Sequence, residues 1–184
     1  INNEQDKIKP CQYSYECVSR IFLNGQMVCA SDVGLGKNDK NFSKKKLIII
    51  GAGPAGLELA LQAVKRNINV SMYEKQEFIG GNLIGASIIY EPYKKLLNYY
   101  QASIKNELID LHLNKKITID DIEMEFPDCE NVVIASGGVP SSSIPNAINV
   151  QSWLNPFIEN NHGEIDSIKL DLKKEKYGNC AILG

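Results

Sequence analysis

Three glycines, Gly51, Gly53 and Gly56, have the spacing G-x-G-x-x-G at the end of a short apolar run. Such a spacing lets a phosphate group approach the backbone closely. The first glycine permits a tight turn, the second leaves room for a pyrophosphate, and the third lets a helix pack against the preceding strand. Pro54 and Ala55 would open that helix, whose unpaired N–H groups and positive dipole end attract phosphates. These residues predict a dinucleotide-binding site.

An acidic residue, Glu74, stands directly after a second apolar segment, residues 69–73. An acid at this place accepts hydrogen bonds from the ribose hydroxyls of adenosine. It also disfavours a 2′-phosphate, so FAD or NAD fits better than NADP. We include its neighbour Lys75 in the predicted site. A tight strand–helix turn without a ligand is the weaker alternative, because strand, glycines, helix and acid occur together.

A second set of reactive side chains precedes the glycines. Cys11, Cys17 and Cys29, with Ser14 between the first two, follow the spacing C-x2-S-x2-C-x11-C. Closely spaced thiolates can surround an iron–sulfur cluster, and a distant one can complete its ligands. Serine oxygen is a harder ligand than thiolate and suits such a cluster less well. The spacing alone leaves open a three-thiolate cluster, a serine-ligated cluster, zinc or no metal.

The remaining cysteines and histidines are not spaced in the sequence as metal ligands are. Cys129 and Cys180 stand alone beside apolar segments and are predicted to be buried structural thiols. His112 and His162 have no partner at ligand spacing, and we expect no catalytic role for either.

The elements that must position these residues follow from hydrophobic periodicity. Short apolar runs predict buried strands, and a spacing of three and four predicts helices. One such stripe consists of Tyr93, Leu96, Leu97, Tyr100 and Ile104, and its aromatic members are expected to belong to the core. The expected strands are 47–50, 69–73, 109–113, 116–119 and 131–135, and the expected helices are 55–65 and 91–106.

Composition narrows the class of protein. The chain has 184 residues, 43% of them hydrophobic, and a formal net charge of −2. Because positive and negative charges nearly balance, electrostatic attraction to nucleic acid or to an anionic membrane is not expected. No apolar stretch approaches the length of a membrane span. Five cysteines without a secretory signal favour reduced thiols and a cytoplasmic location. We expect both ends to be cut, because no initiator Met is present and residues 179–184 resemble the start of another dinucleotide fold.

The chain resembles the carboxyl-terminal part of the 2,4-dienoyl-CoA reductase and trimethylamine dehydrogenase family. Its members are iron–sulfur flavoproteins with an old-yellow-enzyme-like barrel. The glycine motif is shared by many flavoproteins, but its combination with an upstream cysteine arm is specific to this group. The resemblance covers nearly the whole chain and rests on residues 9–11, 17–22, Cys29, the glycine motif, 79–82, 134–140 and 181–184.

The resemblance implies an α/β fold: a Rossmann-like FAD/NAD(P)-binding three-layer domain with a parallel sheet, preceded by a cysteine-bearing arm. It implies an arm and linker over residues 1–45, an incomplete FAD-binding domain over 46–178, and the start of an NAD(P)-binding subdomain over 179–184. The glycines and Glu74 would bind adenosine and pyrophosphate. The cofactor cleft would be lined by Gly81, Asn82, Ala135, Ser136 and Gly137, and the cluster would be held by Cys11, Cys17 and Cys29.

The resemblance also implies an electron path. NAD(P)H would reduce FAD, FAD would reduce a [4Fe–4S] cluster, and the cluster would reduce FMN in the barrel, where an activated carbon–carbon double bond is reduced. In the amine dehydrogenase branch the matching domain holds ADP instead of FAD.

Three departures from the family matter for this path. Ser14 replaces the second cluster cysteine, and the barrel with its FMN and the nicotinamide subdomain are not in the chain. The barrel is therefore an expected partner, in the same or another chain. We predict an FAD-binding electron-transfer module of an NAD(P)H-dependent flavin oxidoreductase. A non-redox, ADP-binding structural domain, or a degenerate fragment of such an enzyme, is the alternative.

Overall fold

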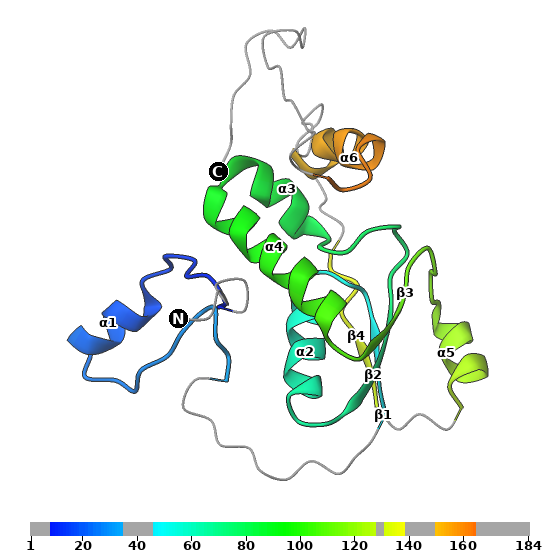
Figure 1. Cartoon of the computed structure of the whole chain (residues 1–184), viewed down its shortest axis with the longest axis horizontal. Coiled ribbons are helices and arrows are strands. Elements are labelled where there is room, and N and C mark those ends of the chain that lie inside the picture. The colour runs from blue at the N-terminus through cyan, green and yellow to red at the C-terminus, as the bar shows by residue number, and fades with distance from the viewer. Residues whose placement is uncertain (1–7, 35–45, 128–130, 139–149, 165–184) are drawn as a thin grey trace, which may run out of the picture.

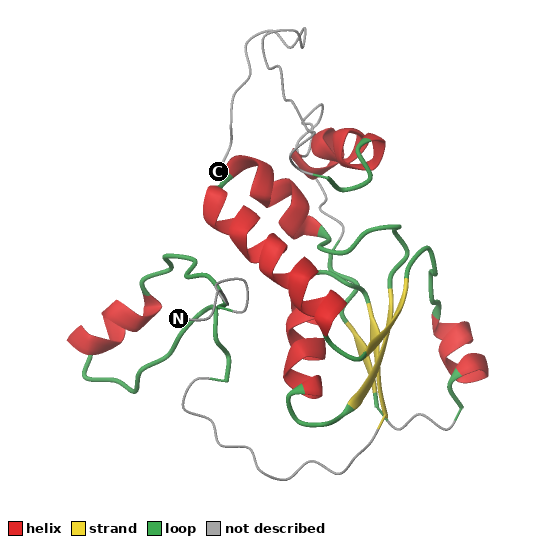
Figure 2. Cartoon of the chain, viewed as in Figure 1, coloured by secondary structure: helices red, strands yellow, loops and turns green. Residues whose placement is uncertain are grey.

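A four-stranded parallel sheet forms the centre of the protein, with strand order β3-β2-β1-β4 (Figures 1 and 2). The computed structural model describes residues 8–34, 46–127, 131–138 and 150–164. The predicted α/β class with a parallel sheet is confirmed. Its strands are β1 (Lys46–Ile50), β2 (Asn69–Tyr73), β3 (Ile109–His112) and β4 (Val132–Ile134).

The two inner strands, β1 and β2, are mostly apolar and are buried after their first residue. In both β1 and β2 only the first residue is exposed and the next four are buried. Parallel strands covered on both faces have such predominantly apolar sequences, and this made both strands predictable from the sequence. The register is in step from Lys46 opposite Asn69 to Ile50 opposite Tyr73. Both strands therefore end at the same edge of the sheet.

Helices cover both faces of this sheet. Helices α2 and α4 lie on one side and α5 on the other (Figure 1). Within the four described stretches, no helix combines the length and the apolar character needed to cross a membrane. The helices are α1 (Glu16–Phe22), α2 (Pro54–Val64), α3 (Asn82–Ile89), α4 (Glu91–Asn106), α5 (Ile119–Glu125) and α6 (Val150–Asn160).

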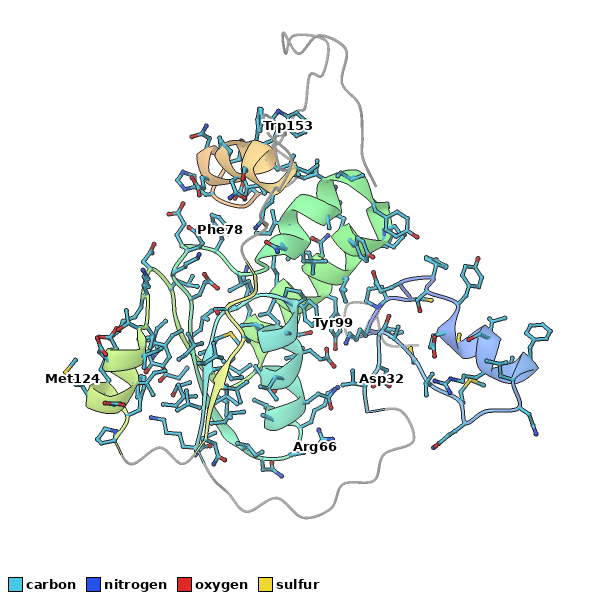
Figure 3. All side chains as sticks on the ribbon, turned by 180° about the vertical axis from the view of Figure 1, so that it is seen from behind. Asp32, Arg66, Phe78, Tyr99, Met124 and Trp153 are labelled. Atoms are coloured by element: carbon cyan, nitrogen blue, oxygen red, sulfur yellow. The ribbon has the colours of Figure 1, made fainter. Side chains whose placement is uncertain are left out.

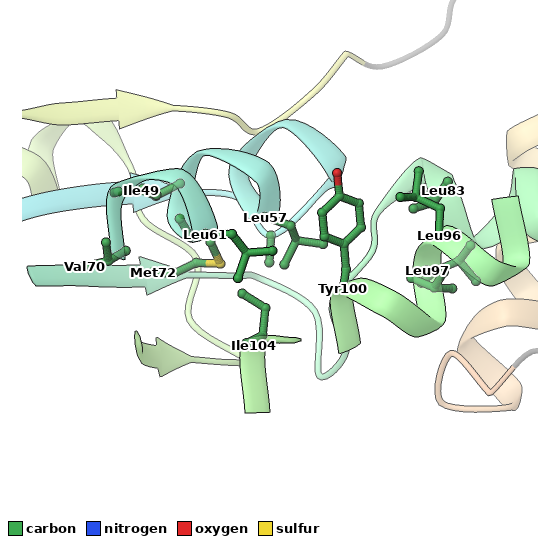
Figure 4. Packing of buried hydrophobic residues seen from close by; sticks show 14 of the residues in the cluster. Ile49, Leu57, Leu61, Val70, Met72, Leu83, Leu96, Leu97, Tyr100 and Ile104 are labelled. Atoms are coloured by element: carbon green, nitrogen blue, oxygen red, sulfur yellow. The ribbon is translucent and has the colours of Figure 1, made fainter. Parts of the chain in front are cut away.

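The larger core lies between the sheet and α2 and α4 (Figure 4). The α4 side chains Leu97 and Tyr100 reach it and are buried, as the helical spacing predicted. Tyr93 of the same stripe is 38% exposed and packs edge-on against Tyr90 instead. The stripe turns away from the core at the start of α4, so the prediction for Tyr93 was wrong.

One expected strand is absent. Residues 116–118 are irregular, and α5 begins at Ile119. The reason is a capping box: the Thr118 hydroxyl accepts from the backbone N–H of Asp121, and the Asp121 carboxylate accepts from the N–H of Thr118. This reciprocal pair satisfies donors at a helix start and favours helix over strand.

The cysteine-bearing arm lies on the α2 and α4 side of the molecule (Figure 1). Its helix α1 buries none of its residues. Its attachment is polar, because the Lys9 ammonium pairs with the Glu58 carboxylate of α2. The boundaries 1–45 and 46–178 stay predictions, and residues 179–184, Cys129 and Cys180 lie outside the described residues.

Candidate dinucleotide-binding site

Gly51 marks the point where three strands meet. Its φ of +107° is a conformation that L side chains rarely adopt, and a Cβ there would lie 2.5 Å from the carbonyl oxygen of Ala135. Its N–H donates to the carbonyl of Tyr73 at 2.7 Å. The residue after β1 is thus enclosed by the ends of β2 and β4, and only glycine fits there.

Gly56 and Gly53 differ in what surrounds them. A Cβ on Gly56 would lie 2.0 Å from the carbonyl oxygen of Gly51, so α2 packs directly on the turn that follows β1. A Cβ on Gly53 would meet nothing within 4 Å. The fold therefore requires Gly51 and Gly56 but leaves open space beside Gly53. This is the space that the motif predicts for a pyrophosphate.

The N-terminus of α2 faces this space. Gly53 is its N-cap and Pro54 its first residue, and no side chain caps the helix. Pro54 and Ala55 are exposed. The first amide groups of a helix lack intrahelical partners and carry the positive end of the dipole, so an anion can bind here.

The carboxylate of Glu74 lies inside the same loop. It is 8% exposed, and its Oε2 accepts a 2.7 Å hydrogen bond from the backbone N–H of Ala52, the residue between the first two glycines. Its Oε1 accepts from the N–H of Gln76 at 3.0 Å. Lys75, the next residue, is exposed. The acid and the glycine turn thus form one unit. In the described part of the chain, no contact to this unit involves Lys75.

The turn before α3 is joined to the glycine loop. The N–H of Gly80 donates to the carbonyl of Ala52 at 2.8 Å. Gly81, with φ +52°, would bring a Cβ within 3.1 Å of the Cα of Gly53. Asn82 follows as the first residue of α3. The starts of α2 and α3 therefore meet, and this places Gly81 and Asn82 beside the predicted phosphate site.

The segment after β4 reaches the same edge. The N–H of Ala135 donates to the carbonyl of Ile50 at 2.7 Å, and Ser136 lies next to Gly51. Gly137 has φ +73°, and a Cβ there would meet no atom within 4 Å. The structure therefore gathers the predicted cofactor residues at the carboxyl edge of the sheet, where ligands bind in doubly wound folds. Their roles in binding stay predictions.

One contributor to this edge was missed. Helix α6 packs on α3, where a Cβ on Gly85 would lie 3.4 Å from Leu154. The Gln151 side chain of α6 donates to Asn82. The apolar spacing of Trp153, Leu154, Phe157 and Ile158 could have revealed the helix, but Pro156 within it argues against a helix when only the sequence is read.

The three cysteines of the arm do not form a ligand set. Cys11 is exposed, Cys17 and Cys29 are half-buried, and all three are free thiols. Among residues 8–34, 46–127, 131–138 and 150–164, no group of three His, Cys, Asp or Glu side chains could hold a metal ion. The Sγ of Cys11 accepts instead from the N–H of Tyr13 at 3.4 Å. The arrangement described does not fit a cluster, and the metal site stays a prediction.

The two histidines lie outside the glycine loop. His112 stacks on Tyr73 with ring centroids 4.6 Å apart, and its Nε2 lies 3.0 Å from Oδ2 of Asp110. Hydrogen bonding from His112, followed by that from Ser71, lowers the pKa of the Asp110 carboxyl despite partial desolvation. His162 pairs with Glu77 in the loop before α3. Both histidines thus have structural partners.

Comparison with known proteins agrees with this geometry. Residues 45–184 match the family model described as pyridine nucleotide-disulphide oxidoreductase. A probable N-methylproline demethylase of Rhizobium meliloti is 26% identical over 165 residues, which are 83% of this chain and 24% of the relative. A cinnamate reductase of Clostridium sporogenes is 28% identical over 146 residues, 75% of this chain and 22% of the relative.

Solved structures show the same fold. A 2-naphthoyl-CoA reductase in complex with 2-naphthoyl-CoA superposes with a TM-score of 0.63 and 32% identity, covering 74% of this chain and 23% of that one. Histamine dehydrogenase from Rhizobium sp. 4-9 has the same TM-score at 17% identity, over 77% of this chain and 22% of that one, and supports the fold alone. The chain therefore spans about a quarter of the length of these relatives.

Proposed function

The chain belongs to the pyridine nucleotide-disulphide oxidoreductase family, and from this premise we propose that it is the FAD-binding electron-transfer module of an NAD(P)H-dependent flavin oxidoreductase. The observation that carries the proposal is the contrast among the glycines. Gly51 and Gly56 are enclosed by backbone, while the space beside Gly53 is open at an uncapped helix start. A pyrophosphate is the group that such a surface accommodates.

The described residues fit the adenosine diphosphate half of FAD. The loop at Gly53 and the first amides of α2 would hold the pyrophosphate, and Glu74 would accept from the ribose hydroxyls. Asn82 at the start of α3 and Ser136 beside Gly51 would line the rest of the cofactor. When bound, the flavin supplies hydride acceptance and one-electron transfer. The residues of this chain bind and orient it.

The rest of the proposed pathway depends on parts beyond the described residues. We propose that NAD(P)H donates the electrons and that a barrel domain with FMN, in the same or another chain, reduces an activated carbon–carbon double bond. Two relatives named as reductases, of cinnamate and of 2-naphthoyl-CoA, support this direction, whereas the N-methylproline demethylase and histamine dehydrogenase belong with amine oxidation. The iron–sulfur relay is supported by the resemblance alone. The cytoplasmic location likewise stays a prediction.

An ADP-binding structural domain is the second candidate. It is favoured by one observation: the tightest contacts of the site, at Gly51, Gly56 and Glu74, all belong to the adenosine diphosphate half. In this candidate the domain would bind ADP without any electron transfer.

The test is the absorption spectrum of the natural full-length protein, purified without oxygen, with identification of the nucleotide released on denaturation. Flavin bands and released FAD are expected. A broad additional shoulder with bound iron would support the relay and show that Ser14 is tolerated. Flavin without iron would support the oxidoreductase proposal and contradict the proposed iron–sulfur cluster. A colourless protein that releases ADP would overturn the flavin proposal in favour of the structural domain.

A further inference from the structure

Helix α6 reaches the candidate site through one polar side chain. The amide nitrogen Nε2 of Gln151 donates a hydrogen bond to Oδ1 of Asn82. Asn82 is the first residue of α3, directly after Gly81, where α3 approaches Gly53. A side chain from much later in the sequence therefore contacts a residue at the phosphate-binding edge.

The direction of this hydrogen bond determines what Asn82 can offer a ligand. An asparagine amide has one acceptor oxygen and one nitrogen that donates two hydrogen bonds. Gln151 occupies the oxygen of Asn82, and in the part of the chain that the structure describes no acceptor binds its nitrogen. The remaining group is therefore a donor. A donor attracts a phosphate oxygen, whereas the amide oxygen would repel one.

We propose that Gln151 is a positioning residue, which holds the side-chain amide of Asn82 with its N–H2 group toward the pyrophosphate of the bound nucleotide. The proposal rests on the nucleotide-binding part of the proposed function and not on electron transfer. Without Gln151 the amide can rotate and present either end. Fixing the donating orientation before binding removes an ordering cost from the binding free energy.

Gln151 is held in place by contacts that do not depend on this hydrogen bond. Leu154 and Ile158 of α6 are buried, at 3% and 7% exposure, and both lie against Gly85 of α3. At the other end of α6, Phe78 packs so closely on Gly163 that a Cβ there would lie 2.7 Å from the ring (Figure 3). Substitution of Gln151 should therefore leave α6 in place.

The test is ADP binding to the full chain, measured by titration calorimetry. Gln151→Met keeps the length of the side chain and removes the donor, and it should weaken ADP binding about tenfold, the usual effect of one hydrogen bond to a charged group. Gln151→Glu is the sharper change. A carboxylate only accepts, so Asn82 would turn its nitrogen toward position 151 and its oxygen toward the phosphates, and binding should weaken further.

Two controls separate positioning from a merely structural role. Adenosine, which has no phosphates, should bind the wild type and Gln151→Met equally. In an Asn82→Ala background Gln151→Met should cause no further loss, because the group that it positions is gone, and Gln151→Glu should retain only its direct charge effect.

The outcomes are distinct. Equal loss from Gln151→Met with and without Asn82, or equal loss for adenosine and ADP, would overturn the positioning role while leaving the nucleotide site intact. A wild-type protein that binds neither ADP nor FAD would overturn the proposed function itself, and this inference with it.

Discussion

The carboxylate of Glu74 accepts a 2.7 Å hydrogen bond from the backbone N–H of Ala52, so the end of β2 holds the loop that joins β1 to α2. Its other oxygen accepts from the N–H of Gln76. A carboxylate offers about four acceptor positions, so Glu74 can satisfy both amides and still accept from ribose hydroxyls. One buried acid can thus both shape the glycine loop and recognise the ligand.

Glu74→Gln should lower both stability and nucleotide affinity. The amide nitrogen would face one of the two backbone donors and leave it without an acceptor, which costs about 1–3 kcal/mol in the free energy of unfolding. Urea denaturation and ADP titration measure the two effects. Lys75→Met, at the exposed neighbouring position, should stay within about 0.5 kcal/mol of the wild type. Wild-type stability and affinity in Glu74→Gln would contradict the role given to this acid.

Gly53→Ala and Gly56→Ala should separate binding from folding. The new methyl group at 53 meets open space, so the protein should fold with near-normal stability but bind ADP much more weakly, because the methyl occupies the pyrophosphate space. The methyl group at 56 would lie 2.0 Å from a carbonyl oxygen and should cost at least about 1–3 kcal/mol of stability. Thermal unfolding and calorimetry distinguish them. ADP binding unchanged in a folded Gly53→Ala variant would show that the nucleotide does not bind beside this glycine.

Lys9→Met should loosen the cysteine arm and leave the sheet domain intact. The substitution removes the ion pair with Glu58, which still accepts from the Tyr100 hydroxyl at 3.0 Å and from Gln62. Brief trypsin treatment should then cleave more rapidly at Arg20 of the arm, with the melting temperature nearly unchanged. Lys65→Met, at an exposed position in the C-cap of α2, is the matched control. Equal cleavage of all three proteins would mean that Lys9 does not anchor the arm.

The N-terminus of α5 should lose stability at low pH. Hydrogen bonds from the backbone and then the hydroxyl of Thr118 lower the pKa of the Asp121 carboxyl. A pKa lowered in the folded state gives stability that is present above the ordinary aspartate pKa and is lost as pH falls through the lowered value, here below about 4. The amide chemical shifts of α5 should follow this titration. Asp121→Asn should abolish it and Asp120→Asn should not. An α5 indifferent to acid in the wild type would contradict the capping box.

Apolar continuity and special glycines made much of this fold predictable. Strands β1 and β2 are buried on both faces, and their sequences leave little choice but a parallel sheet. The glycine loop and Glu74 were predictable because close backbone approach restricts which residue fits. Helix α4 was predicted with the bounds that the structure shows, since its stripe from Leu96 to Ile104 follows the helical period.

Tertiary contacts account for what the sequence did not reveal. Helix α3 is short and apolar on most of its surface, so it has no clear period, and it forms because α4 and α6 pack around it. The Gln151–Asn82 contact joins residues far apart in the chain, and no local pattern indicates such a pair. In place of the strand expected at 116–119, the Thr118–Asp121 capping box begins a helix, and its Thr-x-x-Asp spacing is present in the sequence.

The pairing of β1 with β4 has a consequence for the order in which the molecule assembles. A single helix separates β1 from β2 in the sequence. The pairing of β1 with β4 joins residues much farther apart, such as Ile48 and Val132. Closing so long a loop is entropically slow, so β4 should join the sheet late. Ala135, which encloses Gly51, arrives with it. The nucleotide would then bind only chains that have completed their most distant pairing, and by mass action it would draw the folding equilibrium toward them.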